Sequence, residues 1–192
     1  VIDASLTITD ADNANIESAT ISISSGFVAS EDSLAFKDAN GITGSYNTST
    51  GVLSLSGSAT KAQYEEALES ITYNNTSDNP NTSNRTVSWI INDGDTSSSA
   101  VTSTVTVARV NDAPTITGAD ATLAFTEGDG PTVIDASLKI ADADHSNIES
   151  ATISISSGFV ASEDILAFTD ANGITGSYNA VSYTHLRAHE TV

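Results

Sequence analysis

The chain repeats itself over a long distance. The segment that begins at Val1 returns at Val133, and only six positions differ between residues 1–47 and 133–179, so 41 of 47 are identical. The offset of 132 residues exceeds the roughly 20 to 50 residues of a solenoid repeat and is typical of one whole domain per repeat. The sequence therefore predicts a tandem array of domains.

The repeat boundary lies at "VNDAP", where Pro114 ends any strand ladder and favours an extended residue before it. We predict a first repeat over residues 1–110, which lacks its own first strand because the sequence starts inside the period. A linker over residues 111–114 follows, and residues 115–180 form the N-terminal part of a second, truncated repeat. So short a linker is expected to bring neighbouring domains close together.

The second copy departs from the first after Ala180. The last string, "VSYTHLRAHETV" at residues 181–192, resembles the conceptual translation of a transposase sequencing adapter. We interpret it as the non-native tail of a fragment and expect it to pack against nothing. His185 and His189 beside Glu190 have the spacing of a zinc pair on a helix, but the tail gives that motif no structural context.

Apolar residues alternate with polar ones in several short runs, which predicts strands. Turn signals separate the runs, as in a β-sandwich, so we predict an all-β fold. The alternating sets are Ile2, Ala4, Leu6 and Ile8; Ala19, Ile21 and Ile23; Leu53 and Leu55; Val87, Trp89 and Ile91; Val101, Val105 and Val107; and Ala121, Leu123 and Phe125.

One segment has a helical period instead. Thr60 and Gln63 form a capping box, and the apolar residues that follow recur at i, i+3, i+4 and i+7. We predict a single short helix inserted between strands, over about residues 61–70. Its apolar face consists of Tyr64, Ala67, Leu68 and Ile71.

The charge of the chain limits its partners. It has 25 acidic against 6 basic residues, a net charge of -19, and no cysteine. Such a chain repels phosphate backbones and anionic lipids, so nucleic acid is excluded as a partner. No run of 18 apolar residues offers direct membrane insertion. Hard cations remain as partners.

Catalytic chemistry has few residues to use. Outside the tail the only histidine is His145, and a nucleophile with its base is absent, so we predict that the protein is not an enzyme. The adjacent acids Glu31 and Asp32 point to opposite faces if extended, and we interpret them as solvated loop residues. Trp89 is interpreted as a core residue; the alternative is a platform for a sugar.

The order of several motifs resembles a known family. A Glu in "FTEGDG", then "DADHSN", and the linker "VNDAP" resemble the cadherin pattern. Together with "AQYEEALESITYNN", "VSWIINDG" and "STVTV", they resemble the cadherin-like tandem repeats of large bacterial surface and type I secreted (RTX-type) adhesins, over nearly all of residues 1–180. The resemblance implies tandem immunoglobulin-like or cadherin-like β-sandwiches and an extracellular location on a bacterial cell surface.

The resemblance also implies Ca²⁺ at the junction of the two domains. Calcium takes about six to eight oxygen ligands, and clustered carboxylates repel one another unless a cation neutralises them. The alternative is that these Asp and Asn residues cap their own turns without a metal. Arg109 stands where the family has Asp, the family's Asp-Arg-Glu element is absent, and Asn15 is one residue closer to Asp10 than in the family. The candidate ligands are Asn111, Asp112, Glu127, Asp142, Asp144 and Asn147, with Asp10, Asp12 and Asn15 in the first copy.

Two functions remain open at this stage. The first is a calcium-stiffened spacer in an adhesin, whose partners are neighbouring repeats and whose cell-surface or glycan ligands bind other domains. The alternative is a carbohydrate- or self-binding β-sandwich module of a secreted protein. Aromatic residues make up 6% of the chain, mostly at apolar strand or helix positions, which favours the spacer.

Overall fold

The computed structural model of the chain describes residues 1–178 and 186–190. The chain divides into two compact units, Val1–Val110 and Asn111–Val192, called unit 1 and unit 2 below. Strands are the main regular secondary structure in both units, beside one short helix in unit 1, which confirms the all-β prediction. No helix in the described ranges is long and apolar enough to cross a bilayer.

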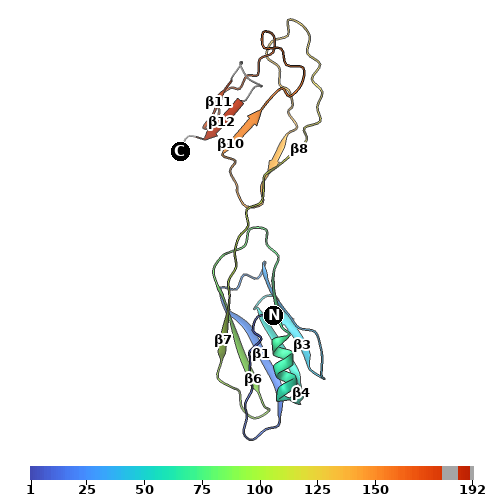
Figure 1. Ribbon diagram of the computed structural model, residues 1–192, viewed down its shortest axis with the longest axis vertical. Helices are drawn as coiled ribbons and strands as arrows, with labels where there is room; N and C mark the ends of the chain where they lie inside the picture. Colours follow the sequence, from blue (N-terminus) through green and yellow to red (C-terminus); the bar gives the residue numbers. More distant parts are fainter. Residues whose placement is uncertain (179–185, 191–192) are drawn as a thin grey trace. The chain divides into compact units, whose positions relative to one another are not determined.

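Unit 1 is built on a five-stranded antiparallel sheet (Figure 1). Its spatial order is β3 (Thr43–Asn47), β4 (Val52–Thr60), β1 (Asn15–Ser25), β6 (Arg85–Asn92) and β7 (Val101–Val105). A second ladder pairs β2 (Asp32–Ala35) with β5 (Thr72–Asn75). The β-sandwich architecture that the sequence predicts is therefore present.

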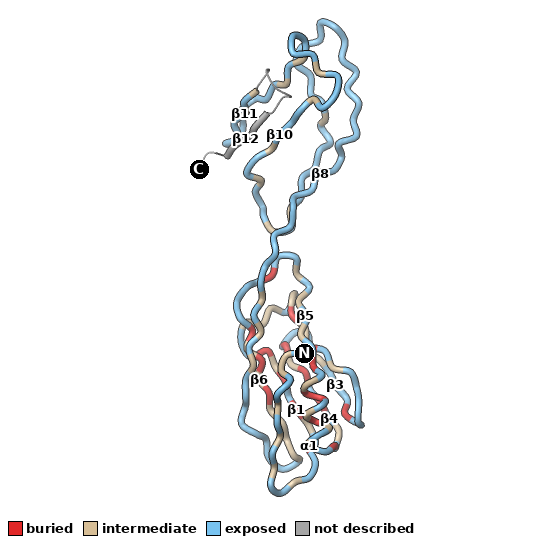
Figure 2. Tube along the Cα trace, viewed as in Figure 1, coloured by how far each residue is buried: buried red, intermediate tan, exposed pale blue. Residues whose placement is uncertain are grey.

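The core of unit 1 lies between these layers, where Figure 2 shows the buried residues of the chain. Ile21, at 0% exposure, stands opposite Leu53 on β4 and opposite Trp89 on β6. Trp89 is 2% exposed, and its Nε1 donates to Ser103 Oγ at 3.0 Å. Trp89 is thus a core residue, as predicted, because no face of its ring is open to a sugar.

Helix α1 (Lys61–Glu69) lies across β1 and β4 (Figure 1). Thr60 accepts from the Gln63 N–H while the Gln63 side chain accepts from the Thr60 N–H, so the predicted capping box is confirmed. Tyr64 is buried on the inner face and donates its hydroxyl to Gly57 O at 2.8 Å. Burial and the nearby charge of Glu17 raise the pKa of Tyr64 to about 12.

The N-terminal alternation does not form the expected strand, since residues 2–8 belong to no ladder. Ile2, Leu6 and Ile8 still pack partly buried against the core. Side chains bind this stretch instead of a neighbouring strand: the Ile8 N–H donates to Glu65 Oε1 at 2.7 Å. The alternating pattern therefore predicted correctly which side chains face the core, but it was wrong in predicting that the backbone pairs with a strand.

Unit 2 contains shorter strands. β8 (Thr115–Thr117) pairs with β9 (Lys139–Ala141), and a three-stranded sheet has the order β10 (Ser150–Ile153), β12 (Leu186–Glu190), β11 (Ile174–Ser177). The expected strand at Ala121, Leu123 and Phe125 is absent, and Phe125 is 60% exposed. No described residue of unit 2 belongs to the buried core, so this run has no buried core on which to pack.

β12 lies within the segment interpreted as a non-native tail, and its backbone contradicts the expectation that this segment packs against nothing. Leu186 pairs with Ile153 of β10, and Arg187 pairs with Ser177 of β11. Residues 181–185 and 191–192 lie outside the described residues, as do the side chains of β12. The zinc spacing of His185 and His189 therefore falls outside the part of the chain that the structure describes.

Candidate metal centre

The two Asp-Ala-Asp segments fold into the same turn. In the Asp10 loop (residues 10–13), Asp10 Oδ1 accepts from the N–H groups of Asp12 at 2.9 Å and Asn13 at 2.7 Å. In the Asp142 loop (residues 142–145), Asp142 Oδ1 accepts from those of Asp144 at 2.8 Å and His145 at 2.7 Å. Aspartate favours such turns because its carboxylate bonds backbone N–H groups two and three residues ahead.

The Asp142 loop gathers ligating side chains. Atoms of Asp142, Asp144 and His145 lie within 4.8 Å of one another. The N–H of Asp112 donates to Asp144 Oδ2, so the linker segment contacts this loop within unit 2. The N–H groups of His145 and Asp144 hold the pKa of Asp142 below its usual value. Asp142 therefore stays ionised at neutral pH, beside the Asp144 side chain.

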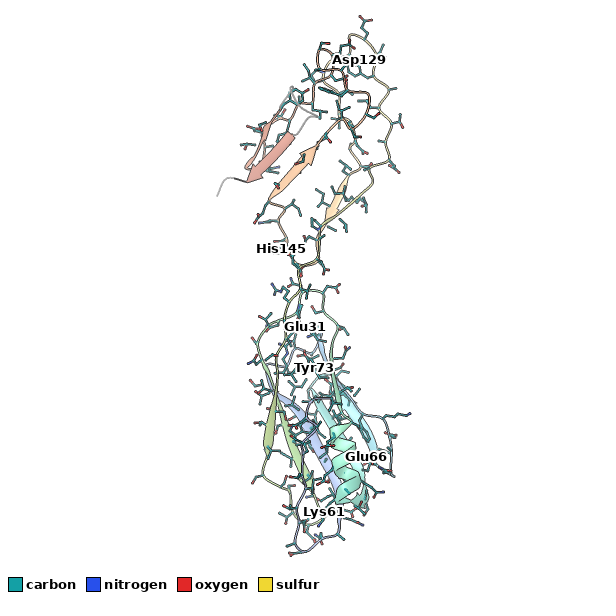
Figure 3. All side chains as sticks on the ribbon, viewed as in Figure 1. Glu31, Lys61, Glu66, Tyr73, Asp129 and His145 are labelled. Atoms are coloured by element: carbon teal, nitrogen blue, oxygen red, sulfur yellow. The ribbon has the colours of Figure 1, made fainter. Side chains whose placement is uncertain are left out.

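In the Asp10 loop a lysine side chain supplies positive charge next to the acidic residues. The ammonium of Lys61, at the start of α1, donates to Asp10 O at 2.8 Å and to Asn13 O at 3.0 Å. Figure 3 labels Lys61 and, in the other unit, His145 of the Asp142 loop. A positive charge thus already occupies the carbonyl side of this loop, which leaves less electrostatic reason for a metal ion there.

Asp93, on the turn after β6, forms a hydrogen bond with the Asp10 loop. Its Oδ2 accepts from Asn13 Nδ2 at 2.9 Å, and its Oδ1 accepts from the N–H groups of Thr96 and Asp95 at 2.7 and 2.9 Å. The N–H groups of Thr96 and Asp95, with the Asn13 amide, lower the pKa of Asp93 to about 2. The hydrogen bonds of Asp93 therefore order its own turn and connect that turn to the Asp10 loop.

The remaining candidate ligands are more scattered. Asp12 and Asn15 are exposed, and the Asn15 amide donates to Ser58 Oγ at 3.3 Å. Asn111 is exposed and donates to Asp112 O at 2.8 Å. Figure 3 places Asp129, two residues after Glu127, at the opposite end of unit 2 from His145.

The structure therefore brings the side chains of Asp142 and Asp144 together, whereas Asp112 contributes its backbone N–H and its carboxylate is not in the group. Among the groups of three or more acidic or histidine side chains in the described residues, none includes Glu127. Asn147 is exposed in the chain that follows the loop. His145 joins the cluster although the sequence offered no calcium role for it, because an imidazole nitrogen is a poor ligand for a hard cation.

The carboxylate oxygens at the Asp142 loop are the kind of ligand that a hard cation binds, but they are fewer than the cation needs. Carboxylate oxygens are the ligands that Ca²⁺ prefers, and it takes six to eight oxygens in all. Asp142 Oδ1 and Asp144 Oδ2 already accept backbone N–H groups. Ca²⁺ bound here would be held by these two carboxylates, with the rest of its shell supplied by water and carbonyl oxygens.

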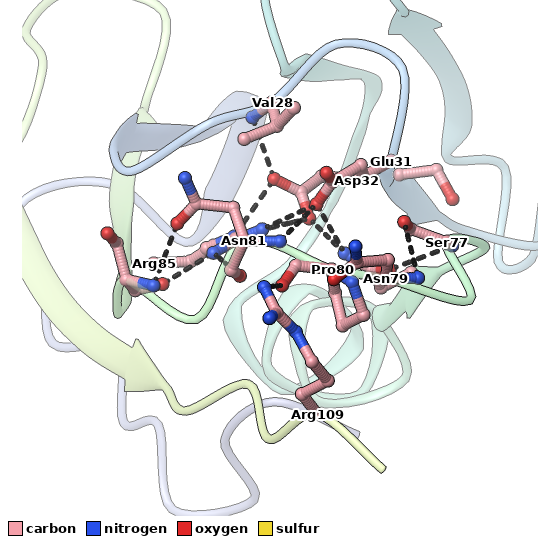
Figure 4. Close-up of polar contacts among 12 residues, drawn as sticks. Val28, Glu31, Asp32, Ser77, Asn79, Pro80, Asn81, Arg85 and Arg109 are labelled. Atoms are coloured by element: carbon pink, nitrogen blue, oxygen red, sulfur yellow. Dashed lines mark hydrogen bonds and ion pairs between the residues drawn. The ribbon is translucent and has the colours of Figure 1, made fainter. Parts of the chain in front are cut away.

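A second polar centre, which the sequence did not reveal, lies inside unit 1 (Figure 4). Asp32 is 4% exposed and Arg85 is 0% exposed, and Arg85 Nε lies 3.0 Å from Asp32 Oδ2. The interpretation of Asp32 as a solvated loop residue is therefore wrong. Its partner is 53 residues away in the chain, and no local pattern connects the two positions.

Several groups satisfy this buried pair. Asp32 also accepts from the Val28 N–H at 2.8 Å, the Tyr73 hydroxyl at 2.6 Å and the Asn75 amide at 2.9 Å. Burial alone would raise the pKa of Asp32, but the hydrogen bonds from Arg85, Tyr73 and their neighbours hold that pKa below its usual value. The pair is therefore ionised and fully hydrogen-bonded, the condition under which a buried charge pair is tolerated.

Comparison with known proteins gives one partial likeness. The chain is 45% identical to Halomucin of Haloquadratum walsbyi over an alignment of 78 residues, which covers 38% of the chain. The chain spans only 1% of that protein's length. No family model matches the chain, and no solved structure matches it significantly.

Proposed function

We propose that the chain is a repeat module of a large extracellular cell-surface protein, and that it acts as a calcium-stiffened structural spacer in adhesion. The observation that carries the proposal is the repeat itself, with an offset of 132 residues and a β-sandwich core in unit 1. The likeness to a small part of the very long Halomucin supports a surface-protein repeat. Repeats of this kind set distance, and ligands bind to other domains.

Calcium acts in this proposal through the Asp142 loop. Asp112 belongs to the linker segment, and its N–H contacts Asp144. A cation bound by Asp142 and Asp144 neutralises the carboxylates of the Asp142 loop. The loop then holds the linker segment more firmly, which stiffens the chain there. Extracellular calcium modules bind at about 10⁻⁴ to 10⁻³ M, so millimolar calcium is the relevant range.

The repeat supplies its own matched control. Asp12 and Asp144 occupy equivalent positions in the two copies, but only the Asp10 loop has Lys61 on its carbonyls. We expect calorimetric titration of the full chain to show one calcium site, which Asp144→Ala abolishes and Asp12→Ala retains. At ten times the dissociation constant, calcium would stabilise the bound unit by about 1.4 kcal/mol.

Equal calcium binding by the wild type and Asp144→Ala would overturn the calcium part of the proposal. The spacer part has its own test, because a spacer should have no ligand-dependent change in unit 1. Hydrogen exchange of β1 and β6 should be the same in calcium and in chelator. Loss of protection there in chelator would contradict it.

A further inference from the structure

A two-residue turn lies between β2 and β3, at Asn40 and Gly41. The Ala39 N–H donates to Ile42 O at 3.2 Å, and the Ile42 N–H donates to Ala39 O at 2.8 Å, which closes the turn. Asn40 has a φ of 56° and Gly41 a φ of 78°, and Asn-Gly is the pair that most readily adopts positive φ at both central positions. Both residues are exposed. Backbone hydrogen bonds therefore fix an Asn-Gly pair that solvent can reach.

The turn contacts two other elements of unit 1. The side-chain amide of Asn40 donates to Glu66 Oε2 at 3.1 Å, and Figure 3 labels Glu66 on α1. On the other side β4 comes so close that a Cβ added at Gly57 would lie 2.3 Å from Gly41 O. The Asn40 side chain thus connects the turn to the helix.

The backbone nitrogen of Gly41 is accessible to a reaction partner. Among the hydrogen bonds of the described residues, none has the Gly41 N–H as its donor. Apart from the chain neighbours of Gly41, no atom lies within 4 Å of the position that a Cβ would take there. Asparagine is one of the thermolabile residues, and here its side-chain carbonyl carbon is followed by a nitrogen that no side chain shields.

We propose that Asn40 is a site of spontaneous deamidation, and that its hydrogen bond to Glu66 slows the reaction. The Gly41 nitrogen attacks Asn40 Cγ, so that a new N–C bond forms and the bond from Cγ to Nδ2 breaks. Ammonia leaves with the amide nitrogen and the proton of the Gly41 N–H, and a cyclic imide remains. Water then opens either carbonyl of the imide, which yields aspartate or isoaspartate at position 40. Water is the only co-reactant.

The contacts of the turn oppose this reaction. Ring closure brings Asn40 Cγ against the Gly41 nitrogen, which requires rotation of the Asn40 side chain and of the peptide between the two residues. The bond to Glu66 opposes the first rotation, and the two bonds between Ala39 and Ile42 oppose the second. The reaction therefore proceeds from an opened turn, and its rate follows the free energy of that local opening.

The product does not restore the contact with α1. An ionised carboxylate only accepts hydrogen bonds, so the new acid faces the Glu66 carboxylate as a like charge. Isoaspartate also lengthens the backbone by a carbon atom and changes the geometry of the turn. Each event adds a negative charge to a chain that already has 25 acidic and 6 basic residues. This modification is independent of the calcium role proposed above.

Peptide mapping of the aged full chain tests the proposal. Trypsin cleaves after Lys37 and Lys61, so the turn is recovered in the peptide of residues 38–61. The chain is first incubated at mildly alkaline pH in water enriched in heavy oxygen. We expect heavy-oxygen-labelled aspartate and isoaspartate at Asn40. Asn47 lies in the same peptide, is also exposed and precedes threonine, so it is the internal control and should remain asparagine.

Three substitutions in α1 separate the hydrogen bond from the charge of the helix. Glu66→Ala removes the acceptor and should raise the deamidation rate about two- to tenfold. Glu66→Gln keeps an oxygen that can accept from Asn40 and should stay near the wild-type rate. Glu69→Ala removes a carboxylate from the same helix and should leave the rate unchanged. Urea denaturation followed by Trp89 fluorescence checks that all three variants remain folded.

The absence of labelled aspartate and isoaspartate at position 40 would overturn the proposal. Equal rates in the wild type and Glu66→Ala would overturn the role of the hydrogen bond. Equal acceleration by Glu66→Ala and Glu69→Ala would overturn that role as well, because the loss of either carboxylate would then act by loosening unit 1.

Discussion

Arg85 and Asp32 form an ion pair in which neither side chain is exposed to solvent, with Nε 3.0 Å from Oδ2. The pair joins the start of β6 to the start of β2, and so connects the two ladders of unit 1. Arg85 also donates to Asn81 O at 2.7 Å, which fixes the polar loop between β5 and β6. One side chain thereby connects β2 with the start of β6 and with the loop that precedes β6.

Removal of the Arg85 side chain should therefore destabilise unit 1 strongly. Arg85→Ala leaves the Asp32 carboxylate buried without its counter-charge, and we expect a loss of about 3 to 5 kcal/mol in the free energy of unfolding of unit 1. Urea denaturation followed by Trp89 fluorescence measures it. Arg109→Ala is the control, because Arg109 is exposed and makes only a 3.3 Å bond to Pro80 O. Similar losses in both variants would contradict the argument.

The capping box of α1 should contribute less to the stability of unit 1 than the ion pair does. Thr60→Ala removes the hydroxyl that accepts from the Gln63 N–H at 3.3 Å, and we expect a loss of about 1 kcal/mol in the stability of unit 1. Thr60→Ser retains the hydroxyl and should lose less. Equal stabilities for the Ala and Ser variants would show that the cap does not support α1.

Asp93 should give unit 1 a defined response to acid. Its pKa is lowered from 3.8 to about 2 in the folded chain, so the folded state favours the ionised form. Its contribution to stability is present above pH 4 and is lost as the pH falls from about 4 to 2. The stability gap between the wild type and Asp93→Asn, measured by urea denaturation, should narrow over that interval. A constant gap would exclude Asp93 as its source.

Lys61 should control whether the Asp10 loop can take a metal. Lys61→Ala removes the ammonium from Asp10 O and Asn13 O, and should destabilise unit 1 by about 1 to 3 kcal/mol. We expect calcium to restore part of this loss and calorimetry to detect a second binding event. Lys37→Ala, at an exposed position, should change neither. An unchanged stoichiometry in Lys61→Ala would refute the idea that lysine substitutes for a metal.

Local patterns predicted the elements whose signal lies within their own residues. The helix follows from Thr60, Gln63 and the apolar spacing of Tyr64, Ala67 and Leu68, all within one short segment. The alternation at Leu53 and at Trp89 likewise marks β4 and β6 correctly. Each of these patterns reports a face that packs on the core, and the core of unit 1 is continuous.

Contacts between distant residues could not be predicted in the same way. Asp32 looks like any loop acid until Arg85 arrives from 53 residues away. The Asp10 loop looks like a metal site until Lys61 reaches it from 51 residues away. In both cases the sequence showed where acidic residues lie but not which basic residue pairs with them.

The inward direction of Lys61 and Arg85 also sets how unit 1 should respond to salt. Two of the chain's 6 basic residues pair with internal partners, so the net charge at the surface is strongly negative. Dissolved ions shorten the reach of that repulsion, from about 10 Å at 0.1 M to about 3 Å at 1 M ionic strength. They cannot reach the Arg85–Asp32 pair, whose side chains are 0% exposed. Concentrated brine should therefore strengthen this fold, because it weakens the forces that oppose folding while the internal attraction persists.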